Sequence, residues 1–170
     1  MDINILLPYK EVYDSSKSGA VSILVKEQIK YSKYKDNIKV FGIGHSKLKN
    51  FIALPKSKFL RNFSYVRNFA NIINDKKSII EIHNRPQYFN YLYRKLKDNN
   101  YVLYFHNNPL ELNGSKSIDE RKYILKNTKI IIFLSEWIKN KFFTDINPNN
   151  YKNFKVIYPG SNKLKKLPNK

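Results

Sequence analysis

Short apolar runs alternate with segments of helical periodicity along most of the chain. Continuous apolar runs of about four to eight residues are typical of strands in a buried parallel sheet. Such runs predict six strands, at residues 3–7, 38–43, 78–82, 101–105, 130–134 and 154–157. Parallel neighbours need long crossover connections, which the intervening helical segments supply. We therefore expect an α/β fold, a doubly wound parallel sheet of about six strands with helices on both faces.

The helical segments differ in the strength of their signals. In the strongest, between the second and third predicted strands, apolar residues recur at steps of three and four and predict one buried helix face. These residues are Phe59, Phe63, Val66, Ala70 and Ile73. Weaker patterns predict helices that begin near Ser18, Tyr88, Ser117 and Ser135. We expect the lysine- and serine-rich segment at residues 44–58 to be a loop.

Composition excludes several classes of site. Cysteine is absent, so disulfide scaffolds, thiol nucleophiles and cysteine-based zinc sites are excluded. Only three histidines are present, and we expect neither a metal nor a cofactor. The longest purely apolar run, Ile130 to Leu134, is five residues long, whereas a membrane span needs ~20. The first residues also lack the features of a secretion signal, so we expect a soluble, cytoplasmic protein.

The net charge is strongly positive, at +19 from 32 basic and 13 acidic residues. A field of this size favours anionic partners. Lys, Asn and Ile fill 69 of the 170 positions, however, and such a bias raises the lysine content without any selection for binding. No acidic residue occurs between Asp36 and Asp75, so this stretch is either a contact for an anionic membrane surface or a solvated face. The candidate contact residues are Lys47, Lys49, Lys56, Lys58, Arg61 and Arg67.

Polar residues follow three of the predicted strands directly. They are His83, Asn84 and Arg85 after the third strand, His106, Asn107 and Asn108 after the fourth, and Ser135 after the fifth. In open α/β sheets, ligands bind at the carboxyl ends of the strands, so these side chains are expected to meet at one edge. The two histidines are candidate general bases or sugar-binding groups, or else satisfied polar groups at strand ends.

A glycine also lies at the predicted start of the first helix. Gly19 and Ala20 would let an anion approach free backbone amides, although an ordinary helix start has the same pattern. The third histidine, His45, lies in a polar segment and is expected to be solvated.

Several enzyme and binding classes lack their motifs in this chain. Neither GxGxxG after the first strand nor GxxxxGK[ST] is present, which disfavours dehydrogenases and P-loop NTPases. The sequence has no GxSxG elbow and no convincing pair of carboxylates for glycoside hydrolysis. A nucleic-acid partner is disfavoured because no zinc finger, aromatic RNA-binding motif or helix-turn-helix pattern is visible.

Three segments resemble, in their order, the amino-terminal domain of GT-B glycosyltransferases, and in particular the family-4-like retaining enzymes. They are IHNRP at 82–86, FHNNP at 105–109 followed by Gly114, and FLSEWI at 133–138. The resemblance covers residues 3–160 and implies a Rossmann-like domain that is one half of a GT-B architecture. It further implies a transferase (hexosyltransferase class) of polysaccharide or lipopolysaccharide assembly, with a nucleotide-sugar donor, a glycan or lipid-linked acceptor and no metal.

The resemblance also implies roles for individual residues. His106 would be the catalytic residue that points at the transferred sugar, and Gly19 with Ala20 would face the donor diphosphate. The acceptor side of the cleft would be lined by His83, Asn84, Arg85, Asn107, Asn108 and Ser135. Three positions depart from the family pattern: Ala20 stands where a second glycine is usual, Asn108 replaces an acidic residue, and Tyr158-Pro159-Gly160 replaces Asn-Gly.

The resemblance divides the chain into residues 1–160, the glycosyltransferase N-terminal domain, and residues 161–170, a linker toward a missing C-terminal donor-binding domain. We expect the chain to be inactive without that domain, and to lie in the cytoplasm, with peripheral contact to the inner membrane face through the basic stretch. Two other functions stay open at this point. One is a non-catalytic basic module that binds an anionic membrane surface or polymer, and the other is a different nucleotide-binding α/β protein.

Overall fold

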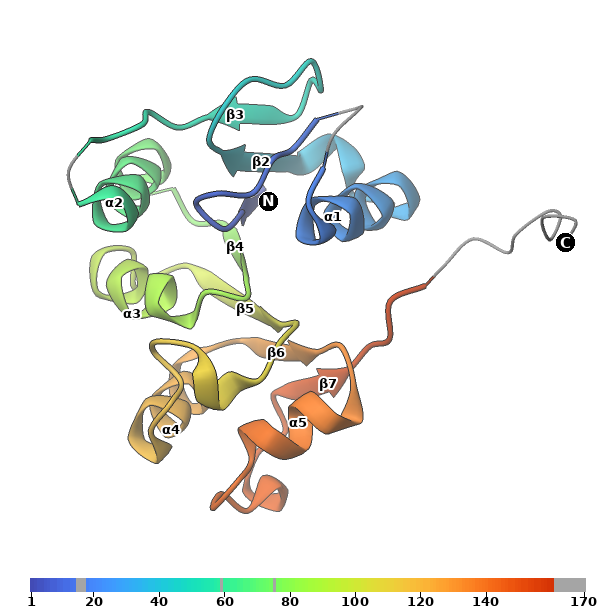
Figure 1. Ribbon diagram of the computed structural model, residues 1–170, viewed down its shortest axis with the longest axis vertical. Coiled ribbons are helices and arrows are strands. Elements are labelled where there is room, and N and C mark those ends of the chain that lie inside the picture. The colour runs from blue at the N-terminus through green and yellow to red at the C-terminus, as the bar shows by residue number, and fades with distance from the viewer. Residues whose placement is uncertain (15–17, 59, 75, 161–170) are drawn as a thin grey trace, which may run out of the picture.

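A single parallel sheet of seven strands forms the centre of the computed structural model, which describes residues 1–14, 18–58, 60–74 and 76–160 (Figure 1). The strands are β1 (Ile3–Leu6), β2 (Ile38–Gly42), β3 (Phe51–Ala53), β4 (Ile79–His83), β5 (Asn100–Phe105), β6 (Ile130–Phe133) and β7 (Phe154–Val156). Their order across the sheet is β3-β2-β1-β4-β5-β6-β7. The chain therefore winds outward from β1 in both directions, and the predicted doubly wound, Rossmann-like α/β fold is confirmed.

Helices cover both faces of this sheet. They are α1 (Ala20–Tyr31), α2 (Arg61–Ile73), α3 (Pro86–Lys95), α4 (Ile118–Asn127) and α5 (Glu136–Phe142), with short 3₁₀ turns η1 (Lys35–Asn37), η2 (Pro109–Glu111) and η3 (Pro148–Asn150). Adjacent residues of β1 belong to different apolar clusters: Leu6 shares one with residues of α2 to α5, and Ile5 shares the other with Val25 of α1. Figure 1 shows α1 on the opposite side of the sheet from α2, α3 and α4.

The seventh strand, β3, was not expected, because residues 44–58 were predicted to be a loop. β3 has only three residues and lies at the sheet edge, where it pairs with β2 from Val40 to Gly42. Its residues are half-buried or exposed, so it lacks the apolar run that marks a central strand. Pairing with β2, and not local sequence, decides its conformation.

The buried face of α2 also differs from the prediction. Phe63 is 48% exposed and contacts the ring of Tyr91 edge-on, and Phe59 lies outside the described residues. The other three predicted residues, Val66, Ala70 and Ile73, are buried as expected, and Tyr65 and Phe69 complete the buried face. Tyr65 was not among the predicted residues. Its ring is fully buried, and its hydroxyl donates to the carbonyl oxygens of Leu7 and Phe41.

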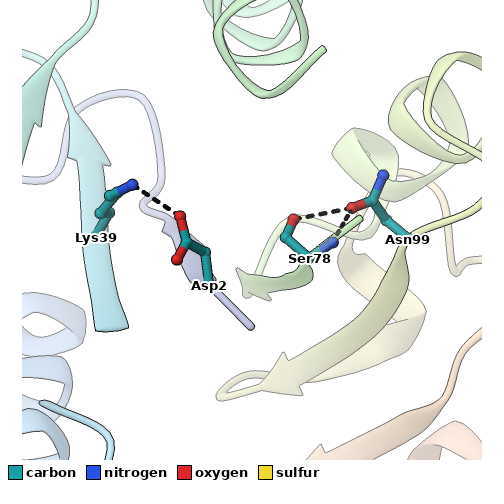
Figure 2. A network of polar contacts seen from close by, with 4 residues as sticks. All are labelled: Asp2, Lys39, Ser78 and Asn99. Carbon is teal, nitrogen blue, oxygen red and sulfur yellow. Dashed lines mark hydrogen bonds and ion pairs between the residues drawn. The ribbon is translucent and has the colours of Figure 1, made fainter. Parts of the chain in front are cut away.

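Two polar contacts hold the amino ends of the central strands (Figure 2). The Nζ of Lys39 on β2 lies 2.8 Å from the Oδ2 of Asp2, just before β1. Ser78 lies just before β4, and Asn99 lies just before β5. The Oδ1 of Asn99 accepts hydrogen bonds from the backbone nitrogen and the Oγ of Ser78, at 2.8 Å each. These contacts lie at the amino ends of the strands. The carboxyl ends, where ligands bind in open α/β sheets, lie on the opposite side of the sheet.

The remaining predictions about chain organisation have mixed outcomes. The predicted helix start near Ser117 is confirmed, and it is a capping box in which Ser117 and Glu120 exchange hydrogen bonds in both directions. Among the described residues, no helix combines the length and the apolar character needed to cross a bilayer. The predicted linker at 161–170 lies outside the described residues.

Candidate functional site

Two histidines meet where β4 and β5 end. His83 is the last residue of β4, and His106 directly follows β5. The Nδ1 of His83 lies 3.1 Å from the Nε2 of His106, so one of these two atoms donates a hydrogen bond to the other. His83 is fully buried, and its ring stacks on that of Tyr104 with 4.3 Å between ring centroids. The sequence placed both residues at one edge, and the structure brings them into contact.

The imidazole of His106 is neutral over the physiological pH range. Burial, with a further contribution from nearby His83, lowers its pKa from 6.5 to about 3. A neutral imidazole has one N–H donor and one nitrogen acceptor. The Nε2 of His106 faces His83, so the Nδ1 atom is the ring nitrogen that can meet a ligand.

Asn84 positions the segment that carries His106. Its backbone has a positive φ of 54°, which asparagine tolerates better than most residues. Its side chain is buried, and the Oδ1 accepts from the backbone nitrogens of His106 and Asn107 at 3.3 Å each. The amide of Asn84 thus couples the end of β4 to the end of β5, and its Oδ1 is used within the protein.

Two other predicted cleft residues are helix caps in the structure. Asn108 caps η2, with its Oδ1 accepting from the backbone nitrogen of Leu110, and Ser135 caps α5 by accepting from that of Ile138. Asn107 is exposed. The Nη1 of Arg85 donates to the backbone oxygen of Asn84 at 2.8 Å. The cleft-lining role of these residues stays a prediction.

The amino end of α1 already holds a carboxylate from the chain itself. Gly19 lies at the start of α1, as predicted, and is its N-cap residue. Because glycine has no side chain, it cannot cap the helix itself. Instead, the Oε1 of Glu11 accepts from the backbone nitrogen of Ser22 at 2.9 Å. A Cβ atom at Gly19 would collide with this carboxylate. A donor phosphate at the same amides would therefore have to displace Glu11.

Replacing Glu11 by alanine is expected to lower the free energy of unfolding by about 1 kcal/mol, because Ser22 loses its acceptor and α1 loses a negative charge at its amino end. The loss is measured by urea denaturation. A Glu27→Ala variant, which removes a half-exposed carboxylate from the same helix, is the control. An equal loss in both variants would contradict the capping role of Glu11.

A cleft of about 700 Å³ lies where β1, β2 and β3 end, and β1 is the neighbour of β4 in the sheet. Its charged lining consists of Lys10, Glu11, Lys56, Lys58 and Arg61, with His45 at its edge. Only one of these charged residues is acidic, and that residue is the Glu11 already engaged by α1. The cleft is therefore strongly cationic and suits an anion such as a phosphate.

A smaller pocket of about 290 Å³ links this cleft to the end of β4. It shares Tyr9, Lys10 and Arg61 with the cleft and adds Arg85, two residues after His83. Sequence reasoning missed Tyr9 and Lys10, although both lie within four residues of the end of β1. Of the predicted basic contacts, Lys47, Lys49 and Arg67 are exposed and line neither pocket.

The described residues form no cluster suited to a metal ion. Across the part of the chain that the structure describes, no three His, Asp or Glu residues are grouped to hold one. The expectation that the protein needs no metal stays a prediction.

A further groove of about 320 Å³ lies on the α1 side, between that helix and the chain after β6 and β7, and Glu27 is its one charged residue among those described.

Comparisons with known proteins give a fold but no family. No family model and no curated protein matches the chain. Among solved structures, the fold is similar to that of HepE from Anabaena in complex with UDP, with a TM-score of 0.63 and 14% identity over 95% of this chain. HepE with UDP and glucose (TM-score 0.63, 13% identity) and HepE with UDP-glucose (0.60, 14%) cover 95% and 94% of it. The chain spans 44–45% of the HepE chains, less than half of their length.

Proposed function

We propose that the chain is the acceptor-side half of a glycosyltransferase in the GT-B arrangement, in which two Rossmann-like domains face a cleft. The observation that carries this proposal is that the hydrogen-bonded His83–His106 pair and a cationic cleft both lie at the carboxyl ends of the strands. The fold shared with HepE, which was solved with UDP and UDP-glucose, supports it. The order of the IHNRP, FHNNP and FLSEWI segments points to the family-4-like retaining enzymes.

The donor is a nucleotide sugar. Its nucleotide binds mainly to a second domain, and its sugar reaches the carboxyl edge of this one, where His106 contacts it. Catalysis then comes from orienting the two substrates and stabilising charge in a closed cleft, with no metal. On this proposal the half described here is inactive by itself, and UDP-glucose is the first donor to test because HepE was solved with it.

The acceptor carries phosphate and occupies the cationic cleft. Lys10 comes from the segment after β1, Lys56 and Lys58 from the segment after β3, and Arg61 from the start of α2. The four cations line one hollow, an arrangement that suits a discrete phosphate or diphosphate. The apolar side chains of Val12 and Ile43 line the same cleft and suit a sugar ring or the start of a lipid. A lipid-linked glycan in polysaccharide or lipopolysaccharide assembly has this chemistry, and its transfer takes place at the cytoplasmic membrane face.

The direct test is transfer by the protein that contains both halves. We expect release of UDP from UDP-glucose that depends on an added phosphate-bearing acceptor, and we expect none from this chain alone. Failure of a panel of nucleotide sugars to give transfer or donor hydrolysis would contradict the proposal.

A second candidate function is binding of the basic face to an anionic membrane or polymer, and charge variants in the cleft discriminate between the two. Replacing both Lys56 and Arg61 by glutamine is expected to weaken pyrophosphate binding to this chain roughly tenfold, because two charge-assisted contacts are lost. The measurement is isothermal titration calorimetry at two salt concentrations. The control is the Lys122→Gln, Lys126→Gln variant on exposed positions of α4. Equal weakening in both variants, together with salt-sensitive binding to acidic vesicles, would favour the membrane candidate.

A further inference from the structure

One nitrogen of the histidine pair has no hydrogen-bond partner in the structure. The Nε2 of His83 is fully buried and unpaired, although the Nδ1 of the same ring contacts His106. Buried polar atoms without a partner are costly, so such an atom usually points to a missing interaction. The carboxylate Oε2 of Glu81 lies 3.7 Å from this nitrogen.

Glu81 and His83 are two residues apart on β4, so their side chains lie on the same face of the sheet. The side chain of Glu81 is 17% exposed and that of His83 is not exposed at all, so the field of the carboxylate is weakly screened by solvent. Tyr104 on β5 holds the ring of His83 by stacking. Burial raises the pKa of Tyr104 above its usual value, so this phenol is neutral and Glu81 is the negative charge next to His83.

This arrangement has a consequence for the protons of both rings. A carboxylate accepts hydrogen bonds only, so it favours a proton on the Nε2 of His83. With the proton of His83 on its Nε2, its Nδ1 is an acceptor, and the Nε2 of His106 must donate to it. His106 is neutral, so its Nδ1 is left without a proton.

We propose that Glu81 is a positioning residue that acts through His83 to fix the tautomer of His106, so that His106 presents an unprotonated Nδ1 to a ligand hydroxyl. The row Glu81–His83–His106 extends from the face of the sheet covered by α1 to its carboxyl edge. The use of this acceptor, to hold a hydroxyl of the transferred sugar, rests on the proposed function. The tautomer of His106 does not depend on the proposed function.

The tautomer is measured directly on this chain with ¹⁵N-labelled histidine and long-range ¹H–¹⁵N correlation spectra. In the wild type we expect the Nε2–H form of His106 to exceed the Nδ1–H form at least fivefold, about the ratio that one net hydrogen bond gives. Removing the acceptor by Glu81→Leu should reduce this excess at least about threefold. The Glu81→Gln variant keeps a carbonyl acceptor and should retain most of it.

A control variant on α1 keeps the result specific. Glu27→Leu removes a carboxylate from α1 that is not next to His83, and it should leave both tautomers unchanged. A predominant Nδ1–H form of His106 in the wild type would overturn the proposal even if Glu81→Leu failed to fold, and so would an unchanged ratio in a folded Glu81→Leu variant. No nucleotide sugar and no sugar acceptor is added in these measurements. Failure of the transfer proposal and failure of the tautomer proposal are therefore observed separately.

Discussion

Replacing His106 by alanine is expected to lower kcat for sugar transfer at least about a hundredfold in the protein that contains both halves, because removal of one preorganised polar group that acts in the transition state has an effect of this size. The fold should persist, since His106 is only half-buried and its backbone nitrogen is held by Asn84. The measurement is the transfer rate at saturating donor, with the unfolding midpoint as a check. A variant with wild-type kcat would exclude His106 from the catalytic machinery.

The Lys122→Gln, Lys126→Gln variant provides the control, since it changes exposed positions of α4 that belong neither to the pair nor to the lining of the cleft. The pH dependence gives a second check. The pKa of His106 is about 3, so His106 takes up a proton only as the pH falls toward that value. His106 should therefore cause no transition near pH 6.5 in the pH profile of the transfer rate. Any transition seen there in the wild type should persist in the His106→Ala variant.

Replacing Gly114 by alanine is expected to lower the free energy of unfolding by about 2–5 kcal/mol, through backbone strain and overpacking together. Gly114 has a φ of +93°, which L side chains rarely adopt. A Cβ there would lie 2.6 Å from the backbone nitrogen of Gln87 at the start of α3, and backbone cannot move aside as a flexible side chain can. Urea denaturation measures the loss.

Gly44 separates the two contributions. Its φ is +106°, but a Cβ added there has no neighbour within 4 Å, so Gly44→Ala tests strain alone and should cost about 1–2 kcal/mol. Equal losses at both glycines would show that the contact with Gln87 is unimportant. Gly114 packs the loop after His106 against the helix that follows His83, so Gly114→Ala should also weaken transfer in any fraction that stays folded.

Local sequence was sufficient for the central strands and for α4. The run at Ile130–Phe133 is apolar throughout because β6 lies between two neighbouring strands and is buried on both faces, and Ser117 with Glu120 marks a helix start by chemistry confined to four residues. It was insufficient for β3, whose three residues become a strand through backbone pairing with β2, and for Tyr65, whose burial depends on acceptors at Leu7 and Phe41.

The candidate site divides in the same way. The sequence by itself determined that His83 and His106 lie at one edge, because they follow neighbouring strands of a parallel sheet. Only the tertiary structure decided that the two rings touch, that Glu81 lies beside the unpaired nitrogen of His83, and that Lys10 completes the cationic cleft. The physical reason is that strand ends are specified by short apolar runs, whereas contacts between side chains depend on strand order, register and loop packing, which residues distant in the chain determine together.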